Sequence, residues 1–177
     1  MAARTVGRPI EGPDEARLWS LIEAAWASLG AKVNRVRRSL SARPPAQPVD
    51  DLPLLKQALE TFTDGLARQC RELTAEDLAV LDLVVERKLY DIDSAELHAI
   101  VDGSDDGFLY ARGFIVAMGR EFYYAVAADV LMAVPGMELE EMCYFFAHRH
   151  HDRYGVFPGA DTGISRESGS NPAGWTG

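Results

Sequence analysis

Cysteine and long apolar runs are both scarce in this sequence of 177 residues. The two cysteines, Cys70 and Cys143, lie far apart and show no metal-ligand spacing, which disfavours a disulfide framework. The longest uninterrupted apolar run, 122–128, is far shorter than the ~20 residues of a membrane-spanning helix. The first ten residues contain no apolar signal-peptide core. We therefore expect a reduced, cytoplasmic protein without membrane contact, and two buried thiols.

Sustained two-residue alternation of polar and apolar side chains is also lacking, so strands are not expected. There is no P-loop and no GxGxxG turn, which disfavours nucleotide binding through these phosphate cradles. Basic charge is in the minority, since 18 Lys and Arg stand against 27 Asp and Glu, for a formal net charge of −9. Residues 1–50 carry +3 and residues 51–177 carry −12, so nucleic-acid binding is disfavoured.

One basic cluster stands apart from this acidic balance and has no interleaved aromatic residue for base stacking. Its members are Lys32, Arg35, Arg37, Arg38 and Arg43. We interpret the cluster as a solvated helix end followed by a linker. A weak anion or RNA contact and a patch for a protein partner are the alternatives.

The composition, 47% hydrophobic and 25% charged, is that of one globular domain with a real core. Apolar residues at three-and-four spacing predict helices over 14–31, 53–71, 74–89, 90–101, 106–129 and 138–154. The sequence thus predicts an all-α fold, a single compact bundle of about five to six helices over residues 13–154. A disordered arm, 1–12, precedes it. An irregular Gly-rich tail, 155–177, follows it and is mobile unless Phe157 or Trp175 docks on the body.

Local signals support these helices. Thr74 followed by Asp77 resembles a capping box, and Gly113 and Gly119 mark close packing or a kink. The helical spacing predicts a core that includes Leu21, Ile22, Trp26, Leu59, Phe62, Leu81, Val85, Phe108, Ile115 and Phe122.

Residues 103–114 hold most of the candidate chemistry. Ser104 is placed to cap a helix, and the first-turn carboxylates of Asp105 and Asp106 suit the helix dipole. Asp105 and Arg112 are seven residues apart and so point to nearly the same side. Structurally, this pattern predicts a capped helix with a buried ion pair. Functionally, it fits recognition of a polar or cationic ligand, a divalent ion, or a general base beside an electrostatic partner.

The same region carries a family resemblance. It reads Ser104-Asp105-Asp106-Gly107-Phe108, then Arg112-Gly113-Phe114-Ile115, then Gly119-Arg120-Glu121. This pattern resembles the signature of a bacterial family, domain of unknown function 4240, over roughly residues 14–154. The resemblance implies a helical intracellular bacterial protein with no established activity. With Glu121 from this pattern, the candidate ligand-binding residues are Ser104, Asp105, Asp106, Arg112 and Glu121.

A second constellation lies near the end of the last expected helix. His148 shares a face with His151 and Asp152, at three- and four-residue spacing. These side chains form part of a zinc or iron shell only if a second carboxylate, such as Asp105 or Asp106, approaches. The alternatives are a polar helix end and a catalytic or pH-sensing histidine. We expect no required metal and no cofactor.

Two functions remain in competition. The first is an interaction, regulatory or ligand-binding module whose partner is a protein or a small molecule. The second is a small helical enzyme built on Ser104, Asp105, Asp106 and Arg112, assisted by the segment 148–151. We favour the module because helix capping already explains most of the motif, whereas a cavity beside Arg112 would favour the enzyme.

Overall fold

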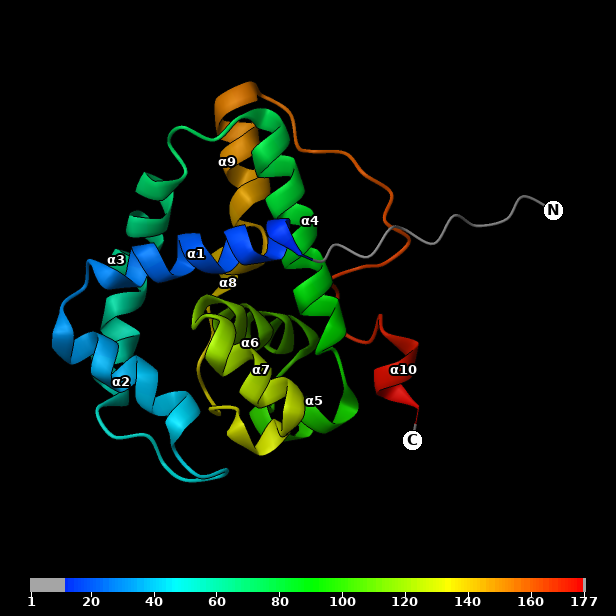
Figure 1. Ribbon diagram of the computed structural model, residues 1–177. Coiled ribbons are helices and arrows are strands. Elements are labelled where there is room, and N and C mark those ends of the chain that lie inside the picture. The colour runs from blue at the N-terminus through cyan, green and yellow to red at the C-terminus, as the bar shows by residue number, and fades with distance from the viewer. Residues whose placement is uncertain (1–11, 177) are drawn as a thin grey trace.

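The computed structural model describes residues 12–176, which contain helices and no strands (Figure 1). The elements are α1 (Pro13–Ala27), α2 (Ala31–Ala42), α3 (Leu52–Gln69), α4 (Ala75–Asp91), α5 (Ala95–Val101), α6 (Asp105–Ala117), α7 (Arg120–Ala128), the 3-10 turn η1 (Val130–Met132), α8 (Glu140–Cys143), α9 (Phe145–Tyr154) and α10 (Pro172–Trp175). The predicted all-α class is confirmed. None of these helices combines the length and apolar character needed to cross a bilayer.

The described residues form ten α-helices, more than the expected five to six. Two of the additional breaks occur at glycines with left-handed backbone: Gly30 has φ +86° and separates α1 from α2, and Gly119 has φ +98° and separates α6 from α7. Few other residues adopt this conformation without strain, so the helical hydrogen-bond ladder ends there. A further break at Tyr144 divides the expected last helix into α8 and α9.

Two predicted helix starts are confirmed by their hydrogen bonds. The Thr74 hydroxyl accepts from the Asp77 backbone N–H at 3.1 Å, and the Asp77 carboxylate accepts from the Thr74 N–H at 2.9 Å. The Ser104 hydroxyl accepts from the Gly107 N–H at 3.1 Å. These bonds satisfy amide groups that the first turn of a helix leaves without partners, which fixes where α4 and α6 begin.

The core is centred on Trp26 of α1. Its ring stacks on Phe62 of α3 with centroids 4.5 Å apart, and its indole N–H donates to the Ala117 carbonyl at 2.7 Å. Nine of the ten predicted core residues are buried, and Leu21 is partly buried against them. Trp26 therefore joins α1 to α3 and to the end of α6.

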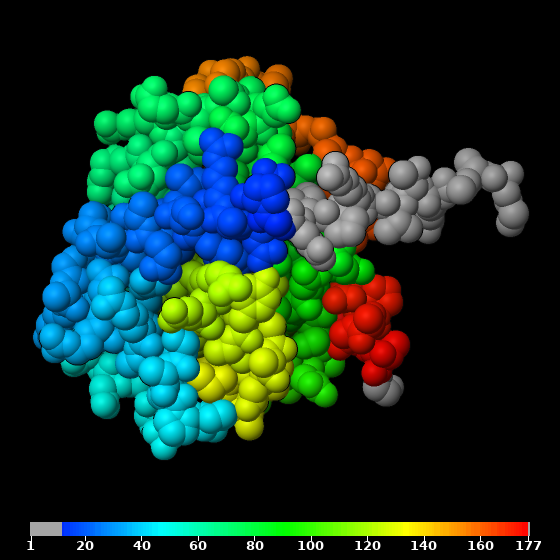
Figure 2. Space-filling model, viewed as in Figure 1, coloured from blue at the N-terminus to red at the C-terminus, as the bar shows by residue number. Residues whose placement is uncertain are grey.

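This packing places α1 across the α6–α7 pair, so that α1 and α7 share one face of the molecule (Figures 1 and 2).

The predicted arm falls on residues 1–11, outside the described part of the chain, and on Gly12. Residues 155–171 form no helix, and α10 is a single turn. Trp175 of α10 packs against Phe108, with ring centroids 6.1 Å apart.

Candidate functional site

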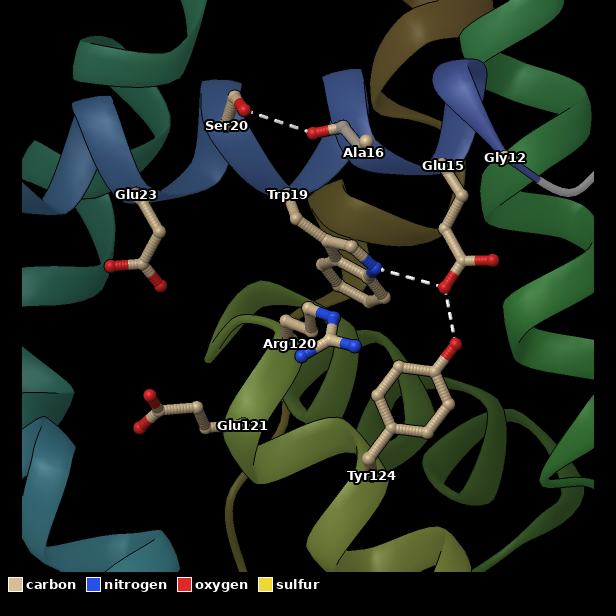
Figure 3. Close-up of a pocket in the computed structure, with 9 residues that line it drawn as sticks. All are labelled: Gly12, Glu15, Ala16, Trp19, Ser20, Glu23, Arg120, Glu121 and Tyr124. Carbon is tan, nitrogen blue, oxygen red and sulfur yellow. Dashed lines mark hydrogen bonds between the residues drawn. The ribbon is translucent and has the colours of Figure 1, made fainter.

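A pocket of about 630 Å³ lies between α1 and α7 (Figure 3). Ligand-binding pockets commonly have volumes of about 300 to 1,000 Å³, and this one falls within that range. Three- and four-residue spacing places its lining side chains on one face of each helix. The lining residues are Gly12, Glu15, Ala16, Trp19, Ser20 and Glu23 from the α1 side, and Arg120, Glu121 and Tyr124 from α7.

Glu15 organises one end of the pocket. One carboxylate oxygen accepts from the Trp19 indole N–H at 3.0 Å and from the Tyr124 hydroxyl, and the other lies 3.0 Å from the Lys88 ammonium. Burial by itself would raise the pKa of Glu15, but these hydrogen bonds and the Lys88 charge outweigh it and lower the pKa. Glu15 is therefore ionised at neutral pH, and both of its carboxylate oxygens already have partners within the protein.

Cations surround the aromatic side of the same end. The Lys88 ammonium lies 5.5 Å from the ring centroids of both Tyr123 and Tyr124. The Arg120 guanidinium lies 5.4 Å from the Tyr124 centroid. Burial, followed by the hydrogen bond to Glu15, raises the pKa of the Tyr124 hydroxyl, so it remains a donor at neutral pH. These contacts hold Tyr124 in place as a wall of the pocket.

Glu23 organises the opposite end. Its carboxylate receives two hydrogen bonds from the Arg37 guanidinium, at 2.8 and 2.7 Å, and Arg37 also donates to the Met118 carbonyl at 2.9 Å. A Cβ on Gly119 would lie only 2.6 Å from a Glu23 oxygen. The glycine between α6 and α7 therefore permits both the turn and the close approach of Glu23.

Arg120 and Glu121 are the remaining charged side chains of the lining. Both are exposed, and neither forms an ion pair with any residue of the range 12–176. Both line the hollow beside α1, where Arg120 extends toward Tyr124 and Glu121 extends toward the Glu23 side (Figure 3). The pocket thus combines a frame fixed by hydrogen bonds with one cation and one anion that have no ion-pair partner among the described residues.

Only one of the five predicted ligand-binding residues, Glu121, lines this pocket. Ser104 caps α6, and the carboxylates of Asp105 and Asp106 are exposed in its first turn. The polar and aromatic lining residues that the sequence reasoning missed are Glu15, Trp19, Ser20, Glu23, Arg120 and Tyr124. A polar stripe with an aromatic member along α1 was the available signal, but nothing local indicated that α7 would face it.

The predicted ion pair between Asp105 and Arg112 is wrong. Arg112 is fully buried, and it donates to the Leu89 carbonyl at 2.8 Å and to the Ser168 hydroxyl at 3.1 Å, while its guanidinium lies 4.6 Å from the Phe108 centroid. Ser168 in turn donates to the Asp105 backbone carbonyl at 2.6 Å. The C-terminal segment therefore supplies the group that the Asp105 carboxylate was expected to provide.

We expect Arg112→Met to lower the free energy of unfolding by about 1 to 3 kcal/mol, because the buried Leu89 carbonyl loses its hydrogen-bond donor. Burial lowers the pKa of Arg112, which reflects the cost of keeping it charged. Urea unfolding of Arg112→Met, Asp105→Asn and the double variant tests this, and the two changes should add independently. A coupling energy of about 3 kcal/mol between the two substitutions would instead indicate that Asp105 and Arg112 form an ion pair.

The histidine segment makes packing contacts. His151 stacks on Phe157 with centroids 4.3 Å apart, His148 meets the same ring at 6.0 Å, and Asp152 pairs with Arg149 at 2.9 Å. Residues 12–176 contain no group of three or more His, Cys, Asp or Glu side chains placed to hold a metal ion. His148, His151 and Asp152 are thus not brought together with a second carboxylate, as a metal shell there would have required.

No protein-family model matches this chain, and comparisons with curated proteins and with solved structures also find no match. Membership of domain of unknown function 4240 therefore stays a prediction.

Proposed function

We propose that this protein is a ligand-binding module and that the α1–α7 pocket is its site. The observation that carries the proposal is the 630 Å³ pocket itself, whose Glu15 and Glu23 ends are fixed by hydrogen bonds. A preorganised frame lowers the entropy cost of binding because few side chains must be ordered when the ligand arrives. A bacterial source and a cytoplasmic location remain predictions that accompany this proposal.

The pocket favours binding of a small polar molecule over a flat protein contact. Its walls mix carboxylates, a guanidinium and two hydroxyls with the rings of Trp19 and Tyr124. The enzyme alternative placed its chemistry on Ser104, Asp105, Asp106 and Arg112, and none of these lines any of the three pockets described on the surface. Full burial of Arg112 under Ser168 further weakens that alternative.

Binding can be detected at the Trp19 indole N–H, whose hydrogen bond to Glu15 lies in the pocket wall. We expect NMR shifts of this signal, and of amides in α1 and α7, on adding a compound from a panel of amino acids, diamines, dicarboxylates, sugars and nucleosides. Ala16→Trp should abolish these shifts, because Ala16 is exposed and lines the pocket. Ala24→Trp is the matched control, since Ala24 is exposed on α1 outside the lining.

Two results would contradict the proposal. One is an absence of shifts with every compound of the panel. The other is binding that shifts signals around Ser104 and Arg112 and is unaffected by Ala16→Trp. This result would indicate that the ligand binds at the site predicted from the sequence.

A further inference from the structure

Negative and positive side chains lie at different places in the α1–α7 pocket. The carboxylates of Glu23 and Glu121 lie toward one end of the view in Figure 3, whereas the Arg120 guanidinium turns away from them toward Tyr124. The Glu23 side chain is 52% exposed in spite of its Arg37 partner, so its outer surface still faces the hollow. A smaller hollow of about 120 Å³ next to α2 is also lined by Glu23 and Glu121, together with Arg37 and Arg38, so the charges balance there and the negative end does not extend toward α2.

Most of the charge in the walls is already compensated. Glu15 is balanced by Lys88, and Glu23 is balanced by Arg37. The described residues provide no such partner for Arg120 or for Glu121. What the site offers a ligand is therefore one guanidinium and one carboxylate, held on adjacent residues of α7 with a second, partly compensated carboxylate nearby.

We propose that the ligand is a small zwitterion of the amino-acid class, an inference that rests on the proposed function. The ligand carboxylate binds the Arg120 guanidinium, whose planar fork suits a bidentate carboxylate. The ligand ammonium binds at the Glu121 carboxylate, with Glu23 adding to the negative potential. The remaining volume, beside Trp19 and Tyr124, accommodates the ligand side chain.

Ligands with a single charge fit the same walls less well. A simple anion would bring its charge close to Glu23 and Glu121 on a protein of net charge −9. A simple amine would leave Arg120 without a partner and would be repelled by it. Only a ligand with both charges meets a complementary group at each end of the pocket.

The test uses the full chain and calorimetric titration with each of the twenty free amino acids. The strongest binder is then compared with its decarboxylated amine and its deaminated acid. We expect both analogues to bind wild type about tenfold more weakly, as loss of one charge-assisted contact predicts. Arg120→Met should remove the preference for the amino acid over the amine, and Glu121→Gln should remove its preference over the acid.

Matched controls are Arg35→Met and Glu76→Gln, which alter exposed residues outside the pocket and should preserve both preferences. Circular dichroism establishes that each variant is folded. Equal affinity of wild type for the amino acid and its amine, or for the amino acid and its acid, would contradict the proposal that the ligand is a zwitterion. It would not contradict the proposal that the pocket binds a ligand. The same holds if only a sugar or a nucleoside from the wider panel binds in the pocket. Failure of every compound to bind would overturn both proposals.

Discussion

Replacing Asp93 by alanine is expected to lower the free energy of unfolding by about 3 to 5 kcal/mol, because a buried charged acceptor with several donors would be lost. Asp93 is fully buried. Its carboxylate accepts from the backbone N–H groups of Gly169, Ser170 and Asn171 at 3.1, 2.8 and 3.0 Å, and from the Trp175 indole N–H at 2.9 Å. This one side chain therefore fixes the end of the C-terminal segment against the body.

Urea unfolding measures the loss, and hydrogen exchange at residues 169–171 shows whether the segment detaches first. Asp93→Asn keeps the shape and one acceptor oxygen, so its effect should be intermediate. Asp152→Ala is the matched control, because its ion pair with Arg149 is exposed and such pairs contribute at most about 1 kcal/mol. An Asp93→Ala midpoint equal to that of the control would mean that the four hydrogen bonds do not hold the segment.

The course of the C-terminal segment could not be predicted from its composition. Its glycines favour irregular backbone, and irregular backbone is found there, but composition says nothing about docking. Gly174 illustrates the difference, since a Cβ at this position would lie 2.1 Å from the Asp93 carbonyl oxygen. The glycine is needed for close approach to α5, and only the tertiary structure shows this.

Local rules succeeded where the cause of the structure is local. The capping box at Thr74 and the cap at Ser104 depend on residues within one turn, and both were predicted. Gly113 and Gly119 gave the same local signal but have different roles. Gly113 stays within α6, where a Cβ would lie 2.5 Å from the Leu139 carbonyl, whereas Gly119 ends the helix with φ +98°. Distant neighbours decide which glycine packs and which one breaks a helix.

The same limit explains the site. The seven-residue spacing predicted that Asp105 and Arg112 meet on one side of α6, but Asp105 is exposed and Arg112 is buried, and the partners of Arg112 come from α4 and from Ser168. Arg37 was interpreted as part of a solvated basic cluster, yet it is buried against Glu23 and the Met118 carbonyl. The α1–α7 pocket exists because Trp19 of α1 contacts Tyr123 and Tyr124 of α7, which lie far away in the sequence, and periodicity within either helix does not predict that contact.

Arg166→Ala is the second substitution with a large expected effect, a loss of about 3 to 5 kcal/mol in the free energy of unfolding, since it leaves a buried carboxylate without its cation. Arg166 donates to both oxygens of Asp82 at 3.1 and 2.9 Å, to Glu86 at 3.3 Å and to the Cys143 carbonyl. Burial by itself lowers the pKa of Arg166, but Asp82 and Glu86 outweigh it and raise the pKa. The guanidinium is therefore charged and binds the C-terminal segment to α4.

Combining Arg166→Met with Asp82→Asn should recover at least half of the loss, because it neutralises the buried pair while keeping the side-chain volume. Glu86 then remains with Thr162 as a hydrogen-bond donor, so full recovery is not expected. Arg87→Met is the matched control, because its i,i+4 pair with Asp91 is partly exposed and such pairs contribute about 0.3 to 0.5 kcal/mol. If Arg166→Ala unfolds at the same urea concentration as this control, the ion pair is not what holds residues 161–168 on the body. Asp93, the packing of Trp175 and the hydrogen bonds of Ser168 to Arg112 and Asp105 would then hold the segment on the body.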